Sequence, residues 1–485
     1  MSAENLIIAA LVLPLFGAIG IVLAGKLPNL REGITLGTAG LLFACVAQLL
    51  APVLAGSRPA VTLLEPLPGL PIAFEVEPLG MLFALTASGL WIVNSVYSIG
   101  YMRGNKEQHQ TRFYLCFALA IAAALAIAFA ANLLTLFLFY ELLTLVTYPL
   151  VTHAGTEQAK RGGRVYLGIL MGTSVLFLLP AVIYTWHLAG TTDFRVGGIL
   201  PAGMDKGEVA ILLALFMFGI GKAALMPFHR WLPAAMVAPT PVSALLHAVA
   251  VVKAGVFTVV KVVVYVFGID ALAGATDWLV AIASFTIVAA SLVALKADNL
   301  KRRLAYSTVS QLSYVILAAA ILAPLSVVGA ALHIAAHACG KITLFFAAGS
   351  IYTAAHKTEV SQLDGIGRRM PWTMAAFGIG ALSMIGLPPA AGFVSKWYLV
   401  SGAIQQAHWF ALAVVLLSTL LNAGYFLPIL HRAFLRPLSA EALAHPHGEA
   451  PLPIVLALML AAGANLALFF FPEVPLALAR QLVQP

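Results

Sequence analysis

The chain has 485 residues, of which 61% are hydrophobic and only 9% are charged, and its formal net charge is +8. Soluble globular domains carry about 25% charged residues, so a soluble fold of this length could not cover so much apolar surface. The composition therefore excludes an ordinary soluble protein and predicts a membrane protein with lipid as its solvent. The basic residues lie mostly in short loops between apolar runs, which indicates membrane orientation and not nucleic-acid binding.

Apolar runs long enough to cross a bilayer, about 20 residues each, recur along the whole chain. They predict an all-α polytopic membrane protein of about 14 transmembrane helices. The predicted spans are 5–25, 32–55, 78–100, 113–130, 133–151, 165–187, 209–228, 241–267, 278–296, 303–322, 325–352, 372–400, 408–430 and 452–471. The longest connections, 188–208, 353–371 and 431–450, are too short for a soluble domain.

The distribution of Lys and Arg supports this set of spans. Of the 27 basic residues, 18 fall in odd-numbered loops, four in even-numbered loops or at the ends, and five inside spans. Cytoplasmic loops carry an excess of Lys and Arg. We therefore expect the odd loops to be cytoplasmic and both termini to be periplasmic, in the inner membrane of a prokaryote.

Two of the predicted spans, the seventh and the twelfth, carry proline breaks. The first break is at Met226-Pro227 and the second at Gly386-Leu387-Pro388-Pro389. Proline removes a helix hydrogen bond, and unpaired backbone at membrane depth is tolerated only where protein or water covers it. Paired broken helices are typical of transport sites.

A faint internal repeat also appears in the sequence. A shift of 166 residues matches Tyr140 with Tyr306, Tyr148 with Tyr314, and Trp231 with Trp397. This shift spans five predicted helices, so the second copy would be inverted in the membrane, as in many transporters. The same register pairs Lys396 with Arg230, so the sequence leaves open whether Lys222 and Lys396 are equivalent.

Glu141 is the only acidic residue at the middle of a span. A charge at that depth costs about 2.5–3.5 kcal/mol on insertion scales, and intramembrane acids usually mark proton or cation paths. A carboxylate that merely pairs with a neighbouring helix is the structural alternative.

Lys222 and Lys253 also lie well inside apolar runs. Desolvation disfavours the ammonium form and a nearby carboxylate favours it, so a lysine between these influences can carry protons near neutral pH. Lys261 lies near the end of its span, and we interpret it as a lysine that extends toward the interface.

His333, His337 and Lys341 recur every four residues and share one helix face over about 12 Å. Three titratable groups in a row predict a segment of a proton wire, although an ordinary polar helix contact is the alternative. The two histidines lack the Glu of an HExxH zinc motif, and we predict no metal site. His247 precedes Lys253 by six residues and belongs either to the same polar axis or to a helix kink. Lys396 follows the second break and completes the series.

These residues resemble a known family. The runs GKAALMPFHRWLP (221–233), APTPVSALLH (238–247) and GLPPAAGFVSK (386–396) resemble the broken-helix signatures of the antiporter-like subunits of respiratory complex I, the NADH:quinone oxidoreductase, and of Mrp-type cation/proton antiporters. The resemblance covers nearly the whole chain. Lysine at 396, with no long arm after the last span, is nearest to the D-type subunit of Mrp antiporters or to a related hydrogenase or complex I-like subunit.

The resemblance implies two inverted five-helix repeats with broken helices 7 and 12, and a hydrated polar axis through Glu141, Lys222, Lys253, the eleventh-helix residues and Lys396. We therefore expect helices 1–3 in 1–110, the first repeat in 111–270, the second in 271–433, and helix 14 with its tail in 434–485. The implied partners are other membrane subunits, protons, the lipid bilayer and, as an open alternative, sodium ions.

Three functions are compatible with the sequence. The first is a proton-translocating subunit of a multisubunit complex, either an Mrp-type antiporter or a complex I-like or hydrogenase-linked pump. The second is a self-sufficient solute transporter, and the third is a structural scaffold, which leaves the cost of the buried charges unexplained. The three cysteines are isolated and no GxGxxG fingerprint occurs, so we predict no cofactor in this chain. Any redox reaction would belong to partner chains, within an enzyme such as a quinone-reducing translocase.

Overall fold

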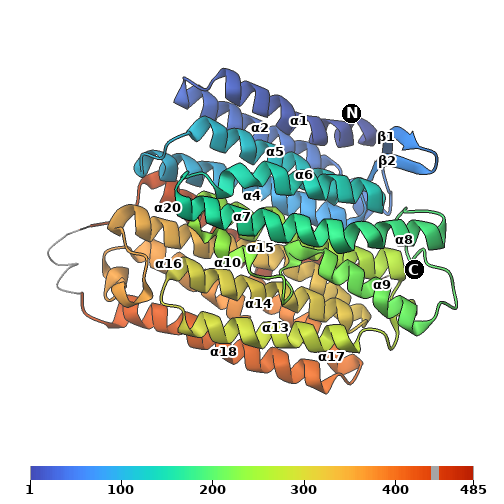
Figure 1. The fold of residues 1–485 in the computed structure, drawn as a ribbon. Helices are drawn as coiled ribbons and strands as arrows, with labels where there is room; N and C mark the ends of the chain where they lie inside the picture. Colours follow the sequence, from blue (N-terminus) through green and yellow to red (C-terminus); the bar gives the residue numbers. More distant parts are fainter. Residues whose placement is uncertain (1, 439–446, 484–485) are drawn as a thin grey trace.

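In the computed structural model, residues 2–438 and 447–483 are described, and they form a bundle of helices that run side by side (Figure 1). The two termini lie at the same end of this bundle, where Arg58 donates a hydrogen bond to Gln481 at 3.3 Å. We call this end the terminal end. Termini at one end require an even number of crossings, in agreement with the predicted topology.

The first third of the chain contains a hairpin of two strands among helices. Its elements are α1 (Ala3–Leu23), α2 (Pro28–Gln48), α3 (Leu50–Leu54), β1 (Ala60–Leu67), β2 (Leu70–Glu75), α4 (Pro78–Gly104), α5 (Gln110–Ala128) and α6 (Leu133–Val151).

The middle third is interrupted by several short helical turns. Its elements are α7 (Glu157–Thr173), η1 (Ser174–Leu178), α8 (Leu179–Ala189), α9 (Lys206–Gly219), η2 (Gly221–Ala223), α10 (Trp231–Ala234), η3 (Ala235–Val237), α11 (Thr240–Ala244), η4 (Leu245–Val249), α12 (Val251–Lys261), η5 (Val262–Phe267), η6 (Asp270–Leu272) and α13 (Asp277–Lys296).

The last third contains the longest helix and the second break. Its described elements are α14 (Leu300–Ala320), α15 (Pro324–Ala355), η7 (Val360–Gln362), η8 (Ile366–Arg368), α16 (Pro371–Ile385), α17 (Ala391–Gln405), α18 (Trp409–Leu435), α20 (Leu452–Phe470) and α21 (Glu473–Arg480). The predicted C-terminal unit 434–485 includes residues 439–446, which lie outside the described residues.

Eleven of the described helices are long and apolar enough to cross a membrane. The other three predicted spans fall on α9, on α14 and on the pair α16–α17. Helix α9 has 14 residues and α16 and α17 have 15 each, because both spans are broken, and α14 contains many hydroxyl side chains. The polytopic helical fold is confirmed, whereas the count of fourteen stays a prediction.

The antiparallel hairpin of β1 and β2 is an element that the sequence analysis missed. It forms at the terminal end, where no bilayer requires a helix, and Gly69 turns it with a φ of 76°. The hairpin leads directly into α4, whose first turn is capped by Glu77. The Glu77 carboxylate accepts hydrogen bonds from the backbone N–H groups of Leu79 and Gly80, both at 2.8 Å.

Both predicted breaks are confirmed. After α9 the chain makes the 3₁₀ turn η2 and then a left-handed residue, Ala224, whereas after α16 it turns at Gly386, with a φ of 87°. A Cβ atom at Gly386 would lie 2.4 Å from Cδ of Lys396. Glycine at this position therefore permits both the turn and the close approach of the lysine.

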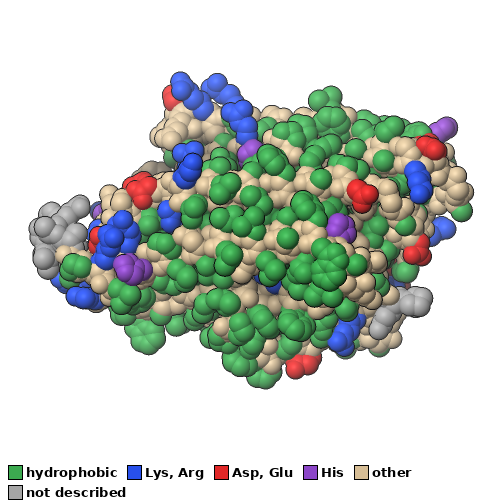
Figure 2. Space-filling view, turned by 90° about the horizontal axis from the view of Figure 1, so that it is seen from below, with side chains coloured by type: hydrophobic (Ala, Val, Ile, Leu, Met, Phe, Trp, Pro, Cys, Tyr) green, Lys and Arg blue, Asp and Glu red, His purple; other side chains and the backbone are tan. Residues whose placement is uncertain are grey.

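The apolar and charged side chains are distributed as a bilayer requires. Figure 2 shows one lateral face, where hydrophobic side chains cover the middle and most charged side chains lie toward the two ends, with Lys and Arg prominent at the end opposite the termini. Residues 326–351 of helix α15 and the segment 240–267 are buried on all sides and form the centre of the bundle.

Candidate functional site

Lys222 lies in the first break, on η2, and is fully buried. Its Nζ donates hydrogen bonds to the backbone oxygen of Tyr140 at 2.8 Å and to Thr144 Oγ1 at 2.6 Å. The same ammonium lies 3.3 Å from the centre of the Tyr140 ring, in cation–π geometry. The break is held in place by Trp231, whose Nε1 donates to the Gly221 oxygen at 2.9 Å.

Glu141 follows Tyr140 on α6, but its carboxylate makes no hydrogen bond to Lys222 within the described residues. Both carboxylate oxygens are buried and have no hydrogen-bond partner among the described atoms. The neighbouring side chains of Leu138, Leu142 and Leu145 are exposed on the outer face of α6. A buried, unpaired carboxylate is costly, so this one requires a proton, water or a group from another chain.

Lys253 on α12 and His337 on α15 are in direct contact. The distance from Lys253 Nζ to His337 Nδ1 is 2.5 Å, and both residues are completely buried or nearly so. The second ring nitrogen of His337, Nε2, has no partner among the described atoms. The eighth-span lysine and the eleventh-span histidine are thus brought together, although 84 residues separate them in the chain.

His333 continues this line along α15. Its ring centre lies 5.9 Å from that of His337. Its Nδ1 is 2.9 Å from Ser395 Oγ, and its Nε2 is 3.1 Å from Gln311 Oε1. His333 therefore connects α15 to α14 and to α17, the helix after the second break.

Lys396 lies on α17 and reaches back to the second break. Its Nζ donates to the backbone oxygens of Met384 at 3.0 Å and Ile385 at 2.9 Å. Met384 O also accepts a hydrogen bond from Gln311 Nε2 at 3.1 Å. Because α16 ends at Ile385, these carbonyl groups have no helix partner, and the break supplies acceptors for a buried ammonium.

Together these contacts form an almost continuous polar chain from α12 to α17. It runs from Lys253 to His337, then to His333, Gln311, Met384 O and Lys396, and the step without a direct hydrogen bond is the one between the two histidine rings. Lys341 lies on the same face of α15 but donates to Leu304 O at 3.2 Å and to Ser307 Oγ, away from this chain.

Four of the eight predicted members, Glu141, Lys222, His247 and Lys341, have no hydrogen bond to this chain within the described residues. Both ring nitrogens of His247 are buried without a partner among the described atoms, and its ring lies 5.0 Å from that of Phe345. Lys222 approaches α12 through its backbone. A Cβ atom at Gly255 would lie 2.4 Å from the carbonyl carbon of Lys222.

The interpretation of Lys261 was wrong. This side chain does not extend to the interface but is 1% exposed, and its Nζ lies 3.4 Å from Glu77 Oε1. Sequence analysis also missed two polar contacts of the predicted residues, Ser395 beside His333 and Thr144 beside Lys222. The pairing of Lys261 depends on Glu77, 184 positions earlier in the chain, so nothing near Lys261 in the sequence indicates it.

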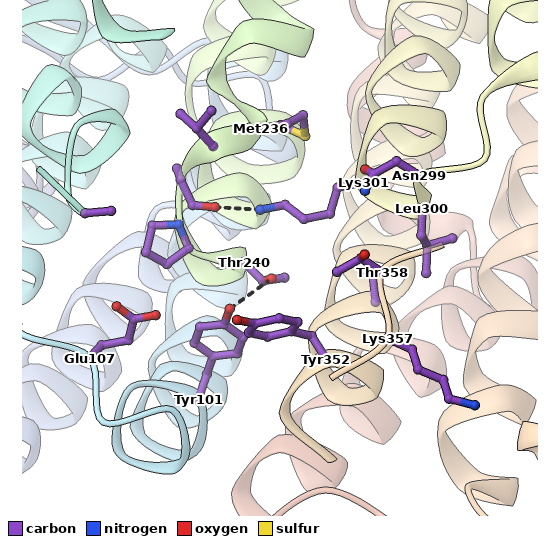
Figure 3. A pocket seen from close by; sticks show the side chains of 15 residues that line it. Tyr101, Glu107, Met236, Thr240, Asn299, Leu300, Lys301, Tyr352, Lys357 and Thr358 are labelled. Carbon is purple, nitrogen blue, oxygen red and sulfur yellow. Dashed lines mark hydrogen bonds between the residues drawn. The ribbon is translucent and has the colours of Figure 1, made fainter. Parts of the chain in front are cut away.

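A cavity of about 290 Å³, lined by both polar and apolar side chains, opens at the end of the bundle opposite the termini (Figure 3). Lys301 reaches across it and donates to Ala238 O at 2.5 Å, and Thr240 Oγ1 lies 3.4 Å from the Tyr101 hydroxyl. Burial raises the pKa of the Glu107 carboxyl in the wall, and the charge of Lys301 opposes that rise. The cavity thus brings a titratable acid and water to the start of α11.

Comparison with known proteins identifies the relatives of this arrangement. Residues 130–422 match the family described as NADH:quinone oxidoreductase/Mrp antiporter, TM. The chain is 34% identical to NADH-quinone oxidoreductase subunit N of Desulforudis audaxviator, over 79% of this chain and 76% of that protein. It is 31% identical to the A/B component of a probable K⁺/H⁺ antiporter of Rhizobium meliloti, over 70% of this chain but only 33% of that longer protein.

A solved structure shares the fold over almost its full length. A chain of the Mrp complex from Dietzia sp. DQ12-45-1b superimposes with a TM-score of 0.83, covering 98% of this chain and 96% of that one. The identity between the two is 21%, so this likeness concerns the fold alone.

Proposed function

Because the chain belongs to the NADH:quinone oxidoreductase/Mrp antiporter transmembrane family, we propose that it is a proton-translocating membrane subunit of a multisubunit complex. Protons move along the line formed by Lys222, Lys253, His337, His333 and Lys396. The observation that carries this proposal is the 2.5 Å contact between Lys253 and His337, two titratable groups in a fully buried environment.

The geometry supports proton exchange within this pair. A charged Lys253 donates to Nδ1 of a neutral His337, whose own proton is then on Nε2. Transfer of one proton gives a neutral amine and an imidazolium, and histidine is suited to both states near neutral pH. The Nε2 atom has no partner among the described atoms, so its proton passes on through water.

The proposal also assigns roles to residues at the two sides of this line, each for its own reason. The cavity beside Thr240 supplies access from the end opposite the termini, which the Lys and Arg asymmetry assigns to the cytoplasm. Glu141 at the outer face of α6 tunes Lys222 and relays protons toward a neighbouring subunit. Lys341 and His247 complete the polar interior but have a supporting role in this proposal.

The division into two repeats is also part of this proposal. Lys222 lies over Tyr140 and Lys396 lies 4.7 Å from the centre of the Tyr314 ring, and both lysine–tyrosine pairs are 82 residues apart in the chain. The equal spacing supports equivalent roles for the two lysines in repeats 111–270 and 271–433. The shift between the pairs is 174 residues, so the predicted shift of 166 does not align these contacts.

Proton pumping along this line is tested with the assembled complex in membrane vesicles. Lys253→Arg keeps a positive charge but does not release a proton, so we expect proton transport to fall at least about 100-fold, the scale of one general acid–base group. Lys160→Arg, at an exposed lysine paired with Glu157, is the matched control. Wild-type transport by an assembled Lys253→Arg variant would contradict the proposal. Adding or omitting Na⁺ in the same assay distinguishes cation exchange from pumping.

A further inference from the structure

A buried ion pair lies near the terminal end, and its lysine is on the helix that also carries Lys253. Lys261 Nζ is 3.4 Å from Glu77 Oε1, with the two side chains 1% and 7% exposed, and it donates to Ala130 O at 2.8 Å. The other carboxylate oxygen of Glu77 accepts a hydrogen bond from the Tyr265 hydroxyl at 2.9 Å. The pair is therefore held by α4, α12, η5 and the connection between α5 and α6.

A cavity of about 240 Å³ opens directly beside this pair. Its wall includes Arg58, Glu75, Phe194 and Arg195 in addition to the ion pair. Glu75 ends strand β2, and Arg58 bonds to Gln481 near the C-terminus, so the cavity faces the terminal end of the bundle. Water at this end can thus reach a buried lysine and two carboxylates.

The ion pair is also close to the proposed proton path. Gly255 of α12 packs against the backbone of Lys222, and Lys261 follows six residues later, a helix rise of about 9 Å. The α5–α6 connection gives a second link, because Ala130 O holds Lys261 and Tyr140 O, on the helix that follows, holds Lys222. The two acceptors are ten residues apart in the chain, so proton transfer between the two ammonium groups requires a file of several water molecules.

We propose that Lys261, Glu77 and Glu75 form a proton port that connects Lys222 with the cavity at the terminal end of the bundle. This inference rests on the proposed function and adds an exit where Lys261 of the first repeat meets Glu75 and Glu77 of the unit 1–110. The Lys261 ammonium gives a proton to the Glu77 or Glu75 carboxylate, which releases it to water in the cavity. The neutral Lys261 amine then accepts the next proton from Lys222 through water, so that only protons move and no bond between heavy atoms changes.

Glu75 is the outermost carboxylate of the port and lies outside the spans. Burial raises the pKa of its carboxyl, the charge of Lys261 lowers it, and the Glu77 carboxylate raises it again. The charge of Arg58 lowers the pKa of Glu75, and that of Asp193 raises it. Arg195 and Tyr265 are the other charged or titratable groups around the cavity. This environment brings the titration of Glu75 closer to neutral pH than that of an exposed glutamate.

A purely structural ion pair is the competing explanation, and Lys261→Arg separates the two. Arginine can keep the pairing with Glu77 and the bond to Ala130 O, but it cannot release a proton. The assay is proton transport by the complex that co-purifies with the tagged chain, reconstituted in proteoliposomes, with Lys206→Arg as an exposed control at the same end. We expect transport by Lys261→Arg to fall at least about 100-fold, and wild-type transport would overturn the port.

Glu75→Gln keeps the test decisive if Lys261→Arg fails to assemble. The Glu75 carboxylate lines the cavity and makes no side-chain hydrogen bond within the described residues, so its amide variant should fold normally. We expect this variant to shift the dependence of the transport rate on the pH of the compartment at the terminal end, and an unchanged profile overturns the port. Failure of the proposed function is distinguishable, because Lys253→Arg would then transport normally as well.

Discussion

Replacement of Lys222 by arginine separates a proton carrier from a fixed positive charge. In the protein the Lys222 ammonium makes two short hydrogen bonds, to Tyr140 O and Thr144 Oγ1, and lies over the Tyr140 ring. A guanidinium can donate to the same two acceptors and stack on the same ring, but it does not deprotonate in proteins. Lys222→Arg therefore conserves the electrostatics and removes the titration.

The expected changes in transport rate and in stability can be derived from these contacts. Loss of a buried relay group lowers transport by about 100-fold, equivalent to about 2.7 kcal/mol of activation free energy. Thr144→Val is the matched control, because it removes one acceptor of the ammonium while Lys222 can still titrate. A hydrogen bond to a charged group contributes about 1.5–3 kcal/mol, so Thr144→Val should lower the unfolding free energy by that amount and retain measurable transport.

Both variants are assayed by pH-dye quenching in vesicles, with assembly of the complex checked by co-purification. We expect Lys222→Arg to assemble and transport at no more than about 1% of the wild-type rate, whereas Thr144→Val is less stable but active. If Lys222→Arg assembles and transports like the wild type, proton release by Lys222 is not part of the mechanism. Loss of assembly in both variants would instead show that the two hydrogen bonds are structural.

Glu141→Gln should assemble but transport protons weakly, and normal transport would exclude a relay role for this carboxylate. Reporter fusions should place the loop 301–303 in the cytoplasm, and a periplasmic reporter there would refute the topology. Gly386→Ala should destabilise the protein by at least about 1 kcal/mol in thermal unfolding, because alanine at positive φ is strained and its Cβ would strike Lys396. Gly168→Ala is its control, since a Cβ there meets open space and alanine favours a helix by about 1 kcal/mol, so equal destabilisation would contradict the steric argument.

The membrane fold and both helix breaks could be predicted from the sequence because they depend on local composition. A run of about 20 apolar residues has few alternatives to a spanning helix, and a Pro-rich break marks its own position. The hairpin at 60–75 was missed because it lies in a connection, where the bilayer imposes no helix and hydropathy gives no signal. The ends of the bundle are therefore less predictable than its middle.

Pairing between distant residues could not be predicted in the same way. The sequence placed Lys253 and His337 on a common polar axis, but their direct contact depends on how α12 packs against α15. A nearby carboxylate was expected to favour the charged form of Lys222, but the ammonium bonds to the backbone oxygen of Tyr140, the residue before Glu141 on α6. Lys261 was interpreted from its depth alone, and its partner Glu77 caps a different helix.

The repeat illustrates how side-chain contacts revise a register taken from sequence matches. Aromatic identities favoured a shift of 166, whereas the two lysine–tyrosine contacts agree on 174, since Tyr140 then corresponds to Tyr314. At this shift Glu141 corresponds to Val315. The second lysine, Lys396, is thus stabilised by backbone carbonyls of the break without an equivalent carboxylate. The two lysines therefore share a tyrosine contact at equal spacing, but a glutamate follows that tyrosine only in the first pair.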